Sequence, residues 1–369
     1  MLNALSTLLL KNDFETKAVL KKLALAHQAL AELKGVATSI PNQNILIDTL
    51  SLQEAKDSSA IENIITTQDE LYRSDFSTQQ FVSLSTKEVY AYVVALKQGV
   101  TKVKENHLLT INHIIEIQKT IVENNAGFRK VPGTALKNEL TKETVYTPPQ
   151  DPSDIVHLMG DLEKFINEDD LCDWDPLVKM AIIHHQFESI HPFYDGNGRT
   201  GRIINILYLI QKNLLDTPIL YLSRYINQNK SDYYRLLQSV REKDIWEEWI
   251  LFILDGIEKT SRQTKDVIID IKAIMQNHKL KLRVELPKLY SQDFLNILFA
   301  YPYTKIERVE HGLSVSRPTA TRYLNETTRI GLLKKEKLGR EHYYVNHDLM
   351  VLLSQVNAKP LFFTYSKNM

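Results

Sequence analysis

The segment of residues 191–202 concentrates the side chains of this sequence that could do chemistry. Pro192 should end one helix, because its ring and its missing N–H stop helical bonding. Gly196 and Gly198 flank Asn197, so the backbone there can take positive φ angles and approach a ligand closely. A glycine-rich turn that enters a helix presents unpaired N–H groups, which is typical of an anion site.

The charged side chains of the same segment predict a polyphosphate ligand. Arg199 and Arg202 are three residues apart and therefore lie on one face of the first helical turn. Their guanidinium groups suit a chain of phosphates. Asp195 offers a hard oxygen ligand for Mg²⁺, which would bridge the phosphates. His191 belongs to the residue type that ordinarily titrates near neutral pH, as a general base should. A plain helical turn with surface arginines is the alternative, but it does not explain why these residue types occur together.

The segment matches H-x-F-x-D-G-N-G-R-x-x-R, the motif of the Fic family, at every specified position. The sequence therefore resembles the Fic-type nucleotidyl transferases. The resemblance implies a protein adenylyltransferase that moves AMP from ATP onto a Ser, Thr or Tyr hydroxyl of a protein, with loss of pyrophosphate. It implies that His191 deprotonates the hydroxyl, that Phe193 anchors the loop and that Asp195 holds Mg²⁺.

The resemblance also implies which residues bind ATP. An anion hole would consist of Gly196, Asn197 and Gly198. Arg199 and Arg202 would bind the β- and γ-phosphates. A tyrosine beyond the core lines the adenosine pocket in family members, which points to Tyr234, although core packing is an alternative for it. Some relatives have an asparagine seven residues later, where this sequence has Arg241.

Residues 58–63 fit the family's inhibitory pattern, (S/T)-x-x-x-E-(G/N). Ser58 and Glu62 are four residues apart and share a helical face. A bidentate pair between Glu62 and Arg202 would take the arginine away from the γ-phosphate and restrain the enzyme. A solvated surface acid is the alternative. Some relatives use this glutamate to remove AMP from the modified target, and the sequence leaves that activity open.

The elements that must position these residues are helical almost throughout, and the expected fold class is mainly α. We expect a Fic helical core with a small β-hairpin flap and a C-terminal winged helix-turn-helix domain. Two strongly apolar stretches flank the motif and should form buried central helices, the first capped by Asp175 with Pro176 in its first turn. The predicted helices cover residues 14–34, with Gly35 as a stop, and then residues from 41 into the early sixties, 87–100, 110–124, 151 onward, 176–190, 203–210 and 246–281.

Residues 127–149 contain Gly, Pro, Asn and Lys around a short β-rich piece, residues 144–147. This composition predicts a small hairpin. The segment resembles the family's flap, which adds a strand to the bound target peptide and aligns its hydroxyl. The alternative is an ordinary surface hairpin.

The C-terminal region resembles a winged helix-turn-helix, with a two-stranded wing around Gly339. Its third helix would offer Arg317, Thr319, Thr321 and Arg322 to a DNA groove, with Lys337 and Arg340 at the phosphate backbone. Dimerisation or packing on the core is the alternative use. The predicted divisions are an N-terminal helical region with the inhibitory helix, a Fic catalytic core, a connecting helix and the winged domain, at residues 1–105, 106–256, 257–284 and 285–355.

The overall composition excludes a global attraction to nucleic acid or membrane, because 45 Lys and Arg residues balance 45 Asp and Glu residues. The single cysteine, Cys172, cannot form an internal disulfide. No apolar run is long enough to span a bilayer, so we expect a cytoplasmic protein without membrane contact. Its expected partners are an unknown protein substrate, with self-modification, a second copy or DNA as further options. The alternative function is a DNA-binding transcriptional regulator whose Fic core senses nucleotide, but the intact His191 argues against it.

Overall fold

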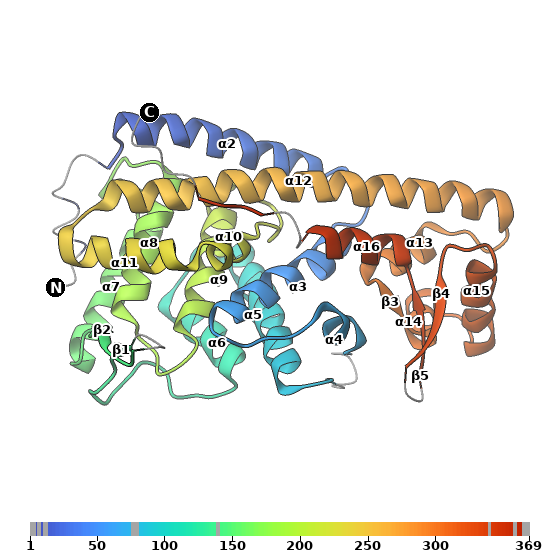
Figure 1. Ribbon diagram of the computed structural model, residues 1–369, viewed down its shortest axis with the longest axis horizontal. Helices are drawn as coiled ribbons and strands as arrows, with labels where there is room; N and C mark the ends of the chain where they lie inside the picture. Colours follow the sequence, from blue (N-terminus) through green and yellow to red (C-terminus); the bar gives the residue numbers. More distant parts are fainter. Residues whose placement is uncertain are drawn as a thin grey trace.

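The computed structural model is mainly helical, as the sequence predicts (Figure 1). It describes residues 14–74, 81–137, 141–338, 341–356 and 360–363, together with residues 5 and 9. The elements that precede the C-terminal domain are α2 (Lys17–Ala37), α3 (Asn44–Ile61), α4 (Gln68–Arg73), α5 (Leu84–Asn106), α6 (Ile111–Val122), β1 (Leu136–Lys137), β2 (Thr144–Tyr146), α7 (Pro152–Asn167), η1 (Asp169–Leu171), α8 (Pro176–Ile190), α9 (Asn197–Gln211), α10 (Leu222–Gln228), α11 (Lys230–Lys243) and α12 (Trp246–Glu285).

The two helices that flank the motif form the centre of the molecule. Helix α8 is buried from Leu177 to Ile190, and α9 is buried almost throughout. The predicted cap of α8 is confirmed, because Asp175 Oδ1 accepts a hydrogen bond from the Leu177 N–H at 2.8 Å and Pro176 occupies the first turn. A helix that is apolar on every side must be surrounded by others. Helices α5, α7 and α12 supply that cover, so the motif loop emerges from a rigid core.

Helices α2 and α12 lie side by side along one edge of the molecule (Figure 1). Lys22 of α2 bonds to Asp255 and Glu258 of α12, each at 2.7 Å. The prediction that Gly35 ends α2 is wrong, because the helix continues to Ala37. A glycine in a helix costs only about 1 kcal/mol, and the extra turn buries Ala37. Packing on the neighbouring helices therefore outweighs the local stop signal.

The predicted hairpin is present at the opposite side of the core. Strands β1 and β2 are antiparallel, with Leu136 opposite Tyr146 and Lys137 opposite Thr144. The register shifts between Leu136 and Lys137, which marks a bulge or irregularity in this pairing. Residues 138–140, which join the strands, lie outside the described residues.

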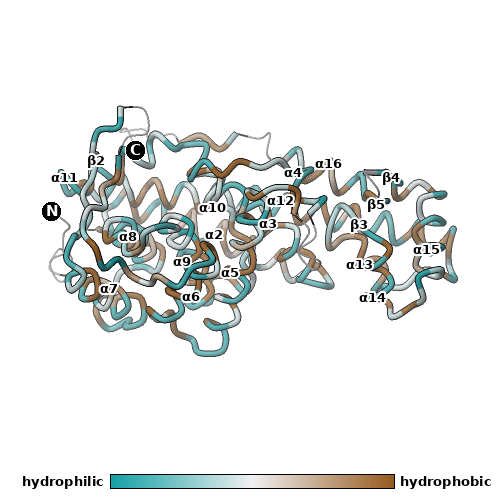
Figure 2. Tube along the Cα trace, turned by 90° about the horizontal axis from the view of Figure 1, so that it is seen from below, coloured by the Kyte–Doolittle hydropathy of each residue, from teal (hydrophilic) through white to brown (hydrophobic). Residues whose placement is uncertain are grey.

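The C-terminal domain lies at the far end of the molecule from α7, α8 and α11 (Figures 1 and 2). The two predicted strands pair with each other, because β4 and β5 are antiparallel, and the short strand β3 adds a third strand on the other side of β5, in the order β3-β5-β4. Gly339 and Arg340, which the sequence places in the wing, lie outside the described residues. The elements are α13 (Gln292–Ala300), β3 (Tyr303–Thr304), α14 (Ile306–Leu313), α15 (Arg317–Arg329), β4 (Lys334–Leu338), β5 (Glu341–Val345) and α16 (His347–Val356).

This order of helices and strands agrees with a winged helix-turn-helix, and that assignment stays a prediction. The predicted domain boundaries also stay predictions. Helix α12 is continuous across the expected boundary between residues 256 and 257. Among the helices of the described ranges, none combines the length and the apolar character that crossing a membrane requires.

His27 connects α2 to the start of α8 through a hydrogen bond to Asp175. This bond should make the stability of the protein depend on pH. His27 Nε2 lies 2.8 Å from Asp175 Oδ2, and this hydrogen bond raises the pKa of His27 above 6.5 despite its partial burial. The stabilisation is complete below pH 6.5 and is lost as the pH rises through the folded-state pKa. We expect His27→Gln to lower the melting temperature clearly at acidic pH and much less at alkaline pH. Thermal unfolding at both pH values checks this; an equal loss at both would contradict it.

Candidate active site

The loop between α8 and α9 is held in shape by its own asparagine. Asn197 Oδ1 accepts a hydrogen bond from the Phe193 N–H at 2.9 Å, and Asn197 Nδ2 donates to the Phe193 carbonyl at 2.8 Å. The Asn197 side chain is therefore engaged inside the loop, and any contribution to an anion site must come from its backbone. Phe193 is fully buried and its ring packs on that of Phe128, with the centroids 5.3 Å apart.

Two glycines let other groups approach this loop closely. Gly196 has a φ of 79°, and a Cβ atom there would lie 2.8 Å from Cγ1 of Val122. A Cβ atom on Gly198 would lie 2.1 Å from Oε1 of Glu62. The Glu62 carboxylate therefore lies directly on the backbone at the start of α9, where the sequence predicts phosphate oxygens.

Arg202 contacts both residues that the sequence predicts to restrain the enzyme, Ser58 and Glu62. Its side chain is only 2% exposed. Arg202 Nη2 donates to Glu62 Oε1 at 2.9 Å and to the Ser58 carbonyl at 2.9 Å, while Nε donates to Ser58 Oγ at 2.7 Å. The predicted bidentate pair is corrected, because one carboxylate oxygen makes the contact and Ser58 takes the remaining bonds. Ser58 thus holds the guanidinium as firmly as Glu62 does.

The ionisation of Glu62 follows from this contact. Burial alone would raise the pKa of Glu62, but the charge and hydrogen bond of Arg202 outweigh it and hold the pKa below its ordinary value. Glu62 ends α3, and Lys230 Nζ donates to the neighbouring carbonyl of Ile61 at 2.8 Å. The C-terminal end of α3 is therefore bound to both α9 and α11.

Arg199 and Asp195 line a cavity of about 290 Å³ on the other side of the loop. Arg199 Nη1 lies 3.1 Å from Oε2 of Glu88, and Nη2 lies 3.6 Å from Oδ1 of Asp195. The Asp195 side chain is 70% exposed, and its Oδ1 also accepts a hydrogen bond from the Gly196 N–H at 2.6 Å. Sequence reasoning missed Glu88, because a single acid on the exposed side of a helix far from the motif carries no pattern.

His191 directly follows α8 and has a left-handed backbone, with a φ of 49°. Burial lowers the pKa of its imidazole to about 4, and the positive charges of Arg129 and Arg241 add to the effect. The expectation that His191 titrates near neutral pH is therefore corrected for this structure. The neutral imidazole can still accept a proton, but it is a weaker base than an ordinary histidine. Its Nδ1 has no hydrogen-bond partner among the described residues.

The predicted adenosine contact, Tyr234, lies on α11 with its side chain about half exposed. Its neighbour Tyr233 is buried and bonds through its hydroxyl to His184 Nε2 at 3.0 Å. Arg241, on the same helix, contacts the hairpin and α8: its guanidinium stacks on the ring of Tyr146 at 3.9 Å and its Nε donates to Ser189 Oγ at 2.9 Å. Arg241 therefore connects α11 to the hairpin, and Tyr146 is a further residue that sequence reasoning missed.

Fold and geometry together define a helical protein in which a carboxylate, that of Glu62, covers the glycine-rich start of a central helix. Three family models match: the Fic/DOC family N-terminal model at residues 20–101, the Fic/DOC family model at residues 108–209 and the C-terminal domain model of SoFic-like protein adenylyltransferases at residues 274–349. These matches follow one another along most of the chain. The chain belongs to the Fic family.

Individual relatives are distant. Proteins called "Protein adenylyltransferase Fic" from Drosophila erecta and Aedes aegypti are 27% and 28% identical over 47% of this chain. The chain spans about a third of the length of these curated relatives. A solved structure of a Fic family protein from Desulfovibrio desulfuricans G20 has a TM-score of 0.56 at 19% identity, covering 89% of this chain and 96% of that one. A Fic domain protein from Bacteroides thetaiotaomicron has a TM-score of 0.54 at 18% identity, covering 67% and 96%. These structures support the fold.

The environment of His191 predicts an unusual titration. We expect its imidazole to titrate near pH 4, far below the ordinary value of 6.5, because burial and two nearby guanidinium groups disfavour the charged form. The corresponding stability is complete above pH 6.5 and is lost as the pH falls toward 4. Histidine ring-carbon NMR over this range provides the measurement, with His191→Gln to assign the signal. Titration near 6.5 in the folded protein would contradict the geometry.

Proposed function

We propose that this protein is a protein adenylyltransferase that transfers AMP from ATP to a hydroxyl side chain of a protein and is restrained by Glu62. The observation that carries the proposal is the contact of Glu62 with both Arg202 and the backbone of Gly198. A carboxylate that occupies an arginine and a glycine-rich helix start stands where an anionic substrate group would bind. The name of the relatives supports adenylyl transfer as the reaction.

The residues divide between binding and proton transfer. Neutral His191 accepts the proton of the target hydroxyl as its oxygen attacks the α-phosphorus. A new P–O bond forms, the bond to the bridging oxygen of the β-phosphate breaks and pyrophosphate leaves. Arg199 and Arg202 bind the β- and γ-phosphates and stabilise the charge that develops there. The backbone N–H groups at the start of α9 add to this anion site, and Tyr234 contacts the adenosine.

A magnesium ion fits this site through Asp195. Its exposed carboxylate lines the cavity beside Arg199. One or two carboxylates together with substrate phosphates are the usual protein ligands of Mg²⁺. When bound, the ion would supply positive charge that neutralises the phosphates. No group of three or more His, Cys, Asp or Glu side chains suited to a metal occurs in the described ranges, so Asp195 would hold an ion that arrives with ATP.

The restraint follows from competition for Arg202. The guanidinium cannot bind the γ-phosphate fully while Glu62 and Ser58 hold it, and ATP then binds in an unproductive pose. Arg199 must likewise exchange Glu88 for phosphate. Removal of the Glu62 side chain leaves a buried cation that lacks its counter-charge, and a phosphate oxygen can replace the carboxylate.

The competition predicts that Glu62→Gly activates the enzyme. A charge-assisted hydrogen bond contributes about 1.5–3 kcal/mol, which corresponds to a rise in transfer of roughly 10- to 100-fold. Labelled ATP with Mg²⁺, followed by mass spectrometry for an AMP group on the protein or on co-purified partners, measures it. His191→Ala in the same background should reduce transfer by about 10²–10⁴-fold and spare ATP binding. Equal transfer by wild type and Glu62→Gly would contradict the proposed restraint by Glu62. Loss of AMP from modified protein would show that the protein also removes AMP from its target.

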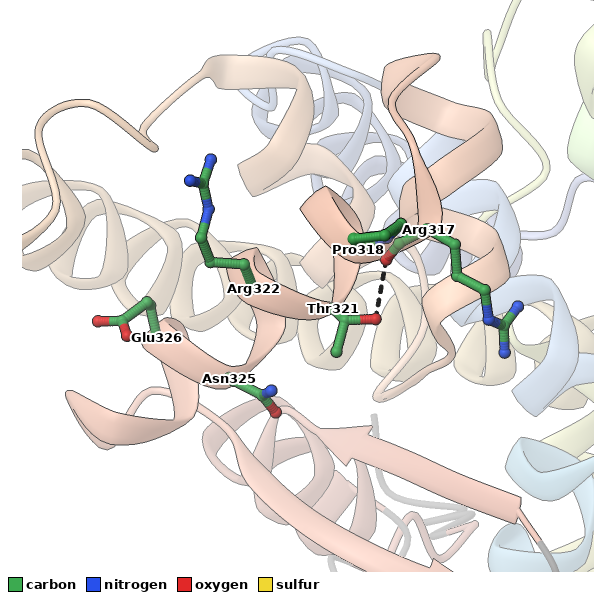
Figure 3. Close-up of a pocket in the computed structure, with 6 residues that line it drawn as sticks. All are labelled: Arg317, Pro318, Thr321, Arg322, Asn325 and Glu326. Atoms are coloured by element: carbon green, nitrogen blue, oxygen red, sulfur yellow. Dashed lines mark hydrogen bonds between the residues drawn. The ribbon is translucent and has the colours of Figure 1, made fainter.

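The C-terminal domain contributes a second binding surface, and DNA and a second copy remain candidate partners for it. Residues of α15 line a cavity of about 570 Å³. Figure 3 shows that the guanidinium groups of Arg317 and Arg322, which belong to this lining, point in different directions. Arg317 pairs with Glu307 at 2.7 Å, and Arg329 pairs with Glu326 at 2.8 Å. These pairs reduce the positive charge that a phosphate backbone needs, so we favour a protein partner here.

A DNA role makes a clear prediction about salt. If α15 binds a duplex, affinity must fall steeply as salt rises, because bound arginines release counterions from DNA. We expect no such binding by the full chain, measured by fluorescence anisotropy with a labelled random duplex from low to physiological salt. Binding that weakens with salt and is lost in Arg322→Ala would establish the DNA role. Sedimentation of the same samples tests a dimer.

A further inference from the structure

We propose that Arg129, at the start of the flap segment, is the positioning residue that holds His191 and the flap in one arrangement. This inference rests on the proposed function. Arg129 is only 1% exposed although its side chain carries a charge. A charged side chain in the interior must be compensated by specific hydrogen bonds, and the partners of Arg129 show what it does.

The side chain of Arg129 binds the backbone at the catalytic turn. Nε donates to the His191 carbonyl at 2.8 Å, and Nη2 lies 3.4 Å from the Ile190 carbonyl. Both carbonyls belong to the end of α8, where the helix leaves its last C=O groups without partners. A cation at this end also interacts favourably with the helix dipole. Arg129 therefore completes the end of α8.

The need for this support lies in the backbone of His191. A left-handed conformation is unfavourable for a residue with a side chain, although it recurs directly after other helices of this structure, as at His107 and Asp244. The His191 N–H bonds to the Phe187 carbonyl at 3.0 Å, and Arg129 fixes the carbonyl on the other side of the same residue. These two bonds restrain the backbone position from which the imidazole extends.

Arg129 joins the two ends of the flap segment to each other and to the motif loop. Its Nη2 donates to the Pro149 carbonyl at 2.8 Å, and its backbone N–H donates to the Pro192 carbonyl at 2.8 Å. The next residue continues the pairing, because the Lys130 N–H donates to the Tyr194 hydroxyl at 2.9 Å. The base of the flap and the motif loop therefore form one unit, so a peptide aligned on the flap is aligned on His191 as well.

Charge adds a second effect that can be measured separately. The charged groups that act on the His191 imidazole are the cations Arg129 and Arg241, which disfavour its protonation, and Glu62, which favours it, as does a hydrogen bond with the backbone of Glu188. Burial is the largest contribution. Loss of the charge of Arg129 should raise the pH at which His191 titrates, whereas replacement by lysine should keep the charge and lose the fork of hydrogen bonds.

The test uses the full chain with Glu62→Gly as the parent and adds Arg129→Met or Arg129→Lys. Self-modification with labelled ATP and Mg²⁺ gives kcat and the KM for ATP, and histidine NMR gives the titration of His191. We expect both variants to lose roughly a hundredfold in kcat, because a small misplacement of a catalytic group has effects of that size, with the KM for ATP within about twofold of the parent. The acid limb of the pH profile of kcat and the His191 titration should both move to higher pH in Arg129→Met, and both should stay in place in Arg129→Lys.

Controls separate this inference from general damage and from the proposed function. Arg329→Met removes an exposed arginine on α15 and should leave kcat and the His191 titration unchanged. An Arg129→Met protein with parental kcat and titration, or one that loses only affinity for ATP, would overturn the positioning role. If the parent itself transfers no AMP, the proposed function fails, and the NMR titration still decides whether Arg129 acts on His191. If Arg129→Met does not fold, Arg129→Lys supplies the test, and parental kcat in it would overturn the inference.

Discussion

A guanidinium group buried in the second turn of α9 is the constraint on which the site depends. Arg202 is almost completely removed from water, so its charge must be matched by an anion or by several oxygen acceptors. Ser58 and Glu62 meet that demand in this structure. In the proposed function, the same demand would make Arg202 a binding site for phosphate once the carboxylate leaves. Inhibition and substrate binding would then be two solutions to one electrostatic requirement.

The helical core converts this requirement into a fixed geometry. Helices α8 and α9 are enclosed on every side, and the short loop between them is closed by the hydrogen bonds of Asn197 to the backbone of Phe193. Since the loop cannot relax independently, His191, Asp195 and the arginines keep their mutual positions. The flap is joined to this loop through Arg129 and through the stack of Arg241 on Tyr146. Chemistry and target alignment thus share one rigid support.

Contacts other than those of Glu62 also bind α3 to the core. Glu54 is buried one turn before Ser58, and it accepts hydrogen bonds from the Ser223 N–H at 3.2 Å and from the Tyr92 hydroxyl at 3.3 Å. Burial raises the pKa of Glu54 to about 7. Together with the bond from Lys230 to Ile61, these contacts hold α3 in place. Helix α3 is thus held along its C-terminal half by contacts that do not involve Glu62.

The sequence by itself determined the residue types of the motif, the helical fold class and the cap at Asp175, and its resemblance to the Fic family pointed to the pairing of Glu62 with Arg202, which the tertiary structure contains as a contact through one carboxylate oxygen. These depend on neighbours along the chain, on helical spacing or on a motif long enough to be specific. The tertiary structure alone decided that α2 passes Gly35, that β3 completes the C-terminal sheet, and that Glu88, Arg129 and Tyr146 belong to the site. Each of these depends on atoms brought together from distant parts of the chain. Packing of whole helices sets such contacts, and no local pattern encodes the distance between two helices.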